Sequence, residues 1–160
     1  MAEKIADELF SAQLELIVIK CATLIETKIK KMINITISEN INRSFIKEHI
    51  KSVVIDSRGK NVHMQYIVEL LTKTFHIFDD ATMIKDNINT FVSKSGYLRS
   101  YNYADFNLAL NTIRNNRNHV AHKGIIDPGT NITTIFQSYY RSIIFIDSLE
   151  SVLANRMSVI

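Results

Sequence analysis

The sequence predicts an all-α fold, a single-domain antiparallel bundle of five or six helices that takes in residues 1–160. Three observations favour it. Apolar residues recur at three- and four-residue steps along most of the chain, which is the period of amphipathic helices. Only one proline and four glycines occur, too few for many short strands joined by tight turns. The 160 residues suit one domain and can bury a sizeable core.

The first half of the chain is expected to hold three helices. Helical spacing of apolar residues predicts a long first helix over residues 3–34. Ser38 is a suitable N-cap for a second helix that continues to His49. The stretch DSRGKN, residues 56–61, is expected to be a loop. A third helix is predicted over residues 62–78, and the residues of its apolar face are Met64, Ile67, Leu71, Phe75 and Phe78.

The second half is expected to hold three more helices. A shorter one is predicted over residues 81–94, with the acidic residues before it favourably placed at its N-terminus. The next runs from Tyr103 to Gly124, a glycine suited to a left-handed C-terminal cap. Residues 126–131, which contain the only proline, are expected to be a loop, and a last helix is predicted over residues 132–157.

Composition limits the class of protein and its surroundings. No run of about 18 apolar residues occurs, so no membrane span is expected, and the N-terminus MAEKIADELF lacks the layout of a signal peptide. The single cysteine, Cys21, lies in an apolar helical stripe and is expected to be a buried side chain in a reducing, cytoplasmic compartment. A net charge of +3 permits an anionic partner but is far from polycationic.

The stretch IRNNRNHVAHKG, residues 113–124, concentrates cationic and titratable side chains at one helix end. At about 100° per residue, Arg114, Arg117, Asn118 and His122 share a polar sector. His119 lies further round the axis. The expected core face of this helix consists of Phe106, Ala109, Leu110, Ile113 and Val120.

The spacing of these residues leaves two arrangements open. Asn118 and His122 are four apart, so the amide can orient the imidazole. Arg117 and His122 are five apart, about 140° around an ideal helix. They could converge on one ligand at a frayed helix end, or they could work with the same residues of a second chain.

The same residues also allow two simpler interpretations. Cations in a last helical turn complement the negative end of the helix dipole, so the stretch could be only a favourable, solvated helix end. His119 and His122 form an H-x-x-H pair, but no nearby carboxylate or cysteine completes a set of metal ligands. No metal site and no cofactor are therefore predicted.

The sequence RNHVAHKG, residues 117–124, resembles the signature of HEPN domains (higher eukaryotes and prokaryotes nucleotide-binding). That signature is an arginine, a polar residue after it, and a histidine after four to six intervening residues. Here four residues separate Arg117 from His122, and Asn118 is the polar follower. Ala121 and Gly124 match a form common in bacterial members. A second frame, Arg114 and His119, has the same spacing.

The resemblance implies RNA cleavage without a metal, at a cleft shared by the two copies of a homodimer. In that case His122 performs acid–base chemistry while a ribose 2′-hydroxyl attacks the neighbouring phosphate, leaving a 2′,3′-cyclic phosphate. Arg117 binds the phosphate and stabilises its charge, and Asn118 orients the reacting groups. Arg114, His119 and Lys123 are expected to bind substrate beside them.

The resemblance also implies a biological setting and an alternative. The protein would be a toxin or anti-phage defence effector, with an antitoxin or another defence protein as a possible partner. Gly124 stands where one toxin–antitoxin branch carries a modified tyrosine, so that form of control gains no support. Many HEPN domains are inactive, and the alternative is a non-catalytic module that binds RNA, a nucleotide or a protein partner.

Overall fold

The computed structural model describes residues 2–40, 44–49, 52, 63–96 and 100–157. The regular secondary structure of these residues is all helix, with no strand among them, which confirms the all-α class. The loop expected at residues 56–61 lies outside the described part of the chain. No helix within that part is long and apolar enough to cross a membrane.

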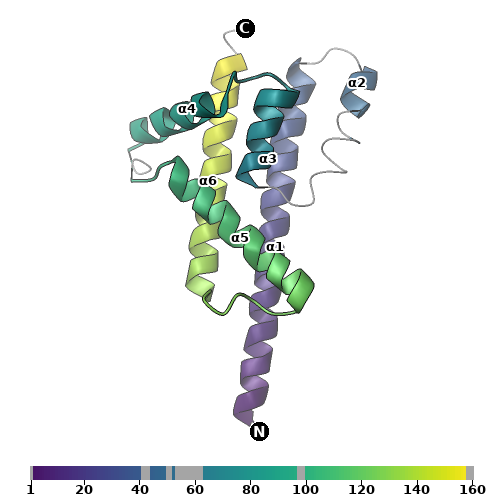
Figure 1. Ribbon diagram of the computed structural model, residues 1–160, viewed down its shortest axis with the longest axis vertical. Helices are drawn as coiled ribbons and strands as arrows, with labels where there is room; N and C mark the ends of the chain where they lie inside the picture. The colour runs from purple at the N-terminus through teal and green to yellow at the C-terminus, as the bar shows by residue number, and fades with distance from the viewer. Residues whose placement is uncertain (1, 41–43, 50–51, 53–62, 97–99, 158–160) are drawn as a thin grey trace.

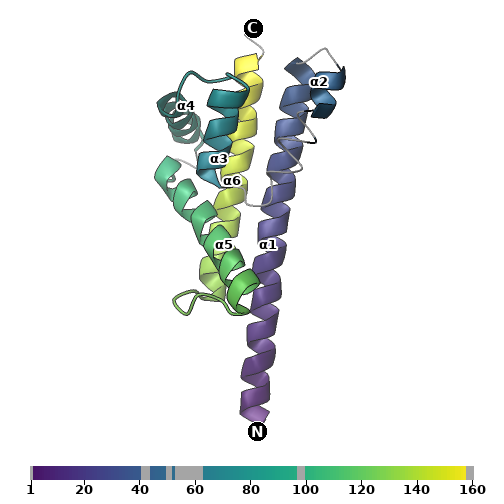
Figure 2. The same ribbon diagram turned by 45° about the vertical axis from the view of Figure 1, so that its right-hand side comes forward.

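Three long helices form the body of the molecule (Figures 1 and 2). Helix α1 (Ala2–Asn40) and helix α6 (Ile132–Met157) lie side by side, and α5 (Tyr103–Lys123) packs obliquely across both. The start of α1 and the end of α6 lie at opposite ends of the molecule in Figure 1, so these two helices run in the same direction.

This arrangement corrects the expectation of a simply antiparallel bundle. Helix α5 runs against both of its long neighbours, and a short connection over residues 124–131 then reverses the chain into α6. Since α5 is already antiparallel to α1, that reversal makes α6 parallel to α1.

The core lies where these three helices meet. A fully buried aromatic contact joins Phe106 of α5 to Phe145 of α6, with ring centroids 5.8 Å apart. Helix α1 contributes Val18, Ile25 and Ile29, all of them at most 3% exposed. Burying a side chain of this size stabilises a fold by about 1.5–3 kcal/mol, so these contacts hold α5 in place.

The first helix continues beyond its predicted end, and the prediction for Ser38 is wrong. Helix α1 runs to Asn40, so Ser38 lies inside it, and the short α2 (Ser44–His49) begins later. The reason is burial: the core face formed by Met32 and Ile33 continues to Thr36, which is buried two residues after the predicted end at residue 34. The Thr36 hydroxyl donates to the Met32 carbonyl within the helix and so is satisfied there.

The predicted helix over residues 62–78 is shorter and changes its winding. It begins as α3 (Met64–Glu69), where His63 caps the N-terminus by accepting from the Tyr66 amide, and continues as the π-helix η3 (Leu70–Thr74). Ile77 and Phe78 lie beyond the helix.

Helix α6 holds this segment in its non-helical form. The Arg156 side chain donates to the Ile77 carbonyl over 2.5 Å and lies 4.9 Å from the centre of the Phe78 ring. Of the apolar face predicted for residues 62–78, Phe75 is half-buried, and the buried members are Met64, Ile67, Leu71 and Phe78.

The remaining helices match their predicted ranges closely. Helix α4 (Ala81–Lys94) begins at an Asp80 cap, whose carboxylate accepts from the Met83 amide over 2.8 Å. Helices α5 and α6 also lie where the periodicity predicts them. The start of α5 is attached to α4, because the Tyr103 amide donates to the Asn89 side chain over 2.9 Å.

Candidate functional site

The candidate site occupies the second half of α5, and both ends of that helix are fixed. At its start Asn102 and Asp105 form a capping box, in which each side chain accepts from the backbone amide of the other. Two donors at the helix start are satisfied by this exchange. Of the core face predicted for α5, Val120 is only partly buried, and the fully buried members are Phe106, Ala109, Leu110 and Ile113.

A buried amide, which the sequence pattern did not predict, fixes the connection after α5. Asn116 is 2% exposed, its amide nitrogen donates to the Thr112 carbonyl over 2.9 Å, and its oxygen accepts from the Asp127 backbone amide over 3.3 Å. The loop is thereby attached to the helix about two turns before its end at Lys123. Buried amides are stable only when hydrogen-bonded, so this contact specifies one loop position.

The last turn of α5 is intact. Gly124 has φ of 66°, in the left-handed region, and its amide donates to the Val120 carbonyl over 3.0 Å. This is the glycine cap that the sequence predicts. Helical geometry therefore holds as far as Lys123, and a frayed helix end that could bring Arg117 and His122 together does not occur.

The structure brings together two of the three predicted catalytic residues. Arg117 and Asn118 are both half-buried, and the Arg117 guanidinium donates to the Asn118 side-chain oxygen over 3.3 Å. His122 and Lys123 lie exposed in the last turn. The described hydrogen bonds do not join His122 to Asn118, so the predicted orientation of the imidazole by that amide is not observed.

The second motif frame is more enclosed. Arg114 and His119 are both half-buried, and the Nε of Arg114 and the Nδ1 of His119 are shielded from solvent without a hydrogen-bond partner among the described residues. Buried nitrogens of this kind are uncommon because each carries a desolvation cost. Within the predicted set, these two nitrogens are the buried polar atoms that no described residue satisfies.

His63 is a titratable neighbour that the sequence did not place here. Burial lowers the pKa of His63, and the nearby positive charge of Arg114 lowers it further. The cap at the start of α3 thus lies within electrostatic reach of α5, which agrees with the packing of α3 against α5. Contacts this distant in sequence leave no trace in a local motif.

The described residues place basic side chains at the end of α5 and do not by themselves assemble a closed site. The last turns of α5 lie against α1 in both views of the molecule (Figures 1 and 2). Arg117 and His122 remain about 140° apart around the intact helix. An arginine–asparagine pair and an accessible imidazole are available, but another surface must complete any cleft around a phosphodiester.

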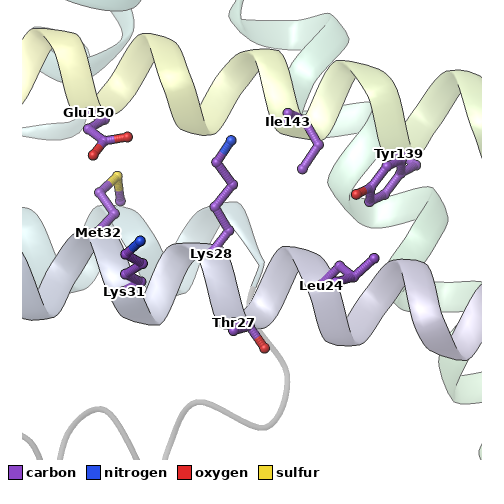
Figure 3. A pocket seen from close by; sticks show the side chains of 8 residues that line it. All are labelled: Leu24, Thr27, Lys28, Lys31, Met32, Tyr139, Ile143 and Glu150. Carbon is purple, nitrogen blue, oxygen red and sulfur yellow. The ribbon is translucent and has the colours of Figure 1, made fainter.

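An open groove of about 450 Å³ lies elsewhere, between α1 and α6 (Figure 3). It contains none of the predicted site residues. Lys28 of α1 projects towards α6 and pairs with Asp147 over 2.5 Å, so one of its two lysines is already neutralised. The residues that line the groove are Leu24, Thr27, Lys28, Lys31, Met32, Tyr139, Ile143 and Glu150.

Neither the single cysteine nor a cluster of metal ligands supplies further chemistry in the described part of the chain. Cys21 is buried, as the sequence predicts, and burial raises the pKa of its thiol, which makes it a poor nucleophile. Across the described residues, no three histidine, cysteine or acidic side chains gather as metal ligands would.

Comparisons of the chain with models of known families, with curated proteins and with solved structures found no match.

Proposed function

We propose that this protein is a metal-independent endoribonuclease of the HEPN type, acting at a cleft that two copies complete. The observation that carries the proposal is the intact second half of α5, which ends in a glycine cap. It presents a hydrogen-bonded Arg117–Asn118 pair, and it leaves His122 accessible to a polyanion. The motif RNHVAHKG supplies the reaction class by resemblance alone.

The proposed reaction is an internal transesterification. One His122 imidazole takes the proton of a ribose 2′-hydroxyl, whose oxygen attacks the adjacent phosphorus. The bond from phosphorus to the 5′-oxygen breaks, and the imidazolium of the second copy gives that oxygen its proton. The products are a 2′,3′-cyclic phosphate and a 5′-hydroxyl. Arg117 stabilises the charge on the phosphate oxygens. The hydrogen bond from its guanidinium to Asn118 fixes the direction of the Arg117 side chain.

Cleavage of a labelled RNA in EDTA tests the proposal. The wild-type protein should leave 2′,3′-cyclic phosphate ends, and His122→Ala should lower the rate by about 100-fold or more, as loss of an acid–base group does. His49→Ala is the matched control, since His49 is exposed on α2, away from the motif. Cleavage by His122→Ala at the wild-type rate would rule out this mechanism.

A non-catalytic RNA-binding module is the second candidate. It is favoured by one observation: the Asn118 oxygen already accepts from Arg117, and no described hydrogen bond orients the His122 ring. This alternative predicts saturable, salt-sensitive RNA binding that Arg117→Ala weakens, with no cleaved product at any enzyme concentration.

The proposed role in the cell is that of a toxin or defence effector with a protein partner that restrains it. Its expression in a bacterial host should then arrest growth, and expression of His122→Ala should not. Equal growth arrest by both proteins would show that toxicity does not come from RNA cleavage.

A further inference from the structure

The first half of α1 carries large apolar side chains that its own protomer does not cover. This part of the helix projects beyond the rest of the molecule in Figures 1 and 2. Ile5 is 52%, Leu9 60%, Leu16 53% and Ile19 42% exposed. Single exposed apolar side chains are ordinary on protein surfaces, but a row of them marks an interaction surface.

These side chains form a continuous row with a fixed period. The spacing alternates between four and three residues over three heptads, which is the pattern of a coiled-coil contact. We call the row the α1 seam, and its members are Ile5, Leu9, Ala12, Leu16, Ile19 and Thr23.

The α1 seam lies on the opposite side of the helix from the core. The core stripe of this segment contains Leu14, Val18 and Cys21, all of them buried. At 100° per residue the centres of the two rows are about 170° apart. Helix α1 is therefore apolar on two sides, and a helix of that kind is normally covered on both. Its own protomer covers only one.

The charges beside the α1 seam favour a second copy of the chain in parallel orientation. Glu15 and Lys20 flank the seam on opposite sides, five residues apart, and both side chains reach solvent. In a parallel, in-register pair, Glu15 of each copy lies beside Lys20 of the other, which gives two ion pairs. In the antiparallel pairing centred on the seam, Glu15 faces Glu15, which is repulsive.

We propose that the α1 seam joins two copies of this chain in parallel and in register. The paired segment, from about Ile5 to Thr23, is close to 30 Å long at 1.5 Å per residue. Parallel pairing places the C-terminal ends of the two α5 helices at the same level along the pair. The inference stands apart from the proposed nuclease activity, because it concerns only assembly.

Sedimentation equilibrium of seam variants tests the assembly. The wild-type chain should be a dimer, and Leu9→Glu and Leu16→Glu should each be monomers with unchanged helix content by circular dichroism. Leu108→Glu is the matched control: Leu108 is 62% exposed, as Leu9 is 60%, but it lies on α5. A monomeric wild type, or seam variants as dimeric as the control, would overturn the proposal.

Two further variants test the orientation. Glu15→Lys and Lys20→Glu should each weaken the dimer by about tenfold, and the double variant should recover it. Ala12→Cys should form a disulfide-linked dimer on oxidation, since Ala12 meets Ala12 only in the parallel register, whereas the native Cys21 is buried. A double variant as weak as the single ones, or no cross-link at position 12, would overturn the parallel arrangement.

Discussion

At the scale of single residues, Asn116 determines how the candidate site is bounded. Its amide group connects the interior of α5 to the loop that follows, through the Thr112 carbonyl and the Asp127 amide. Both partners belong to the backbone, so the contact depends on Asn116 alone. The side chain carries no chemistry itself and acts by holding the loop against the helix that bears Arg117 and His122.

Asn116→Ala is expected to destabilise the protein by about 1–3 kcal/mol, because the Asp127 amide loses its partner next to the core. Urea unfolding followed by circular dichroism measures the change. Asn115→Ala is the matched control, since Asn115 is the exposed neighbour on the same helix. Equal stability of the two variants would show that the loop does not depend on the Asn116 contact.

His63 is expected to give the stability a dependence on pH. Its pKa in the folded protein is lowered, first by burial and then by the charge of Arg114, from the ordinary 6.5. Below about pH 6.5 the unfolded chain binds this proton and the folded chain resists it, so stability falls as the pH drops towards the folded pKa. Above about pH 6.5 this group contributes no slope.

Replacing Arg114 by glutamine should raise the His63 pKa, which should stay below 6.5 because burial is the larger cause. Titration of the His63 ring proton by NMR measures the shift. His49 serves as the reference resonance on a distant, exposed helix. An unchanged His63 pKa in the Arg114→Gln protein would mean that the two side chains are not coupled.

The sequence predicted the local part of the candidate site and missed the long-range part. The proximity of Arg117 and Asn118 follows from their adjacency on one polar sector. The burial of Asn116 was missed because an asparagine within an apolar row does not alter the helical period. The coupling of His63 to Arg114 joins residues 51 positions apart, which a pattern within one helix cannot contain.

At the scale of elements, the end of α5 is the boundary that matters most. The left-handed backbone conformation of Gly124 costs roughly 1–2 kcal/mol of conformational energy for a residue that has a Cβ atom. Gly124→Ala should therefore destabilise the protein by about 1 kcal/mol and loosen the last turn that carries His122 and Lys123. Thermal unfolding measures the first effect.

Gly129→Ala is the matched control for that change. Gly129 lies in the same connection without a left-handed φ, and an added Cβ would stand at an ordinary 3.7 Å from Asp127. Its stability should stay within about 0.5 kcal/mol of wild type. A larger loss at Gly129 than at Gly124 would contradict the cap as the stabilising feature.

The element boundaries show which signals a sequence carries. The limits of α4, α5 and α6 were predictable, because caps such as Asp80 and Gly124 coincide with the ends of apolar periodicity. The N-cap prediction for Ser38 was wrong because a serine can cap a helix or continue one. Here the helix continues, since Thr36 beside it is buried. The π-helix η3 was missed because apolar spacing at residues 62–78 fits an ordinary helix equally well.

At the scale of the whole molecule, the proposed pairing along α1 makes stability depend on protein concentration. A dimer that dissociates on unfolding melts at a higher temperature when it is more concentrated. The melting temperature of the wild-type chain should rise between micromolar and hundred-micromolar samples, and that of Leu9→Glu should stay constant. A constant melting temperature for both proteins would argue against coupled folding and assembly.

The projecting end of α1 has one more consequence. Ile5 and residues 7–13 are all exposed, and a helical stretch of about a dozen residues is only marginally stable in water without neighbours. Amide hydrogens there should exchange with heavy water quickly in dilute solution and slowly once the chain is abundant. The order of this segment would then report how much of the protein a cell has made.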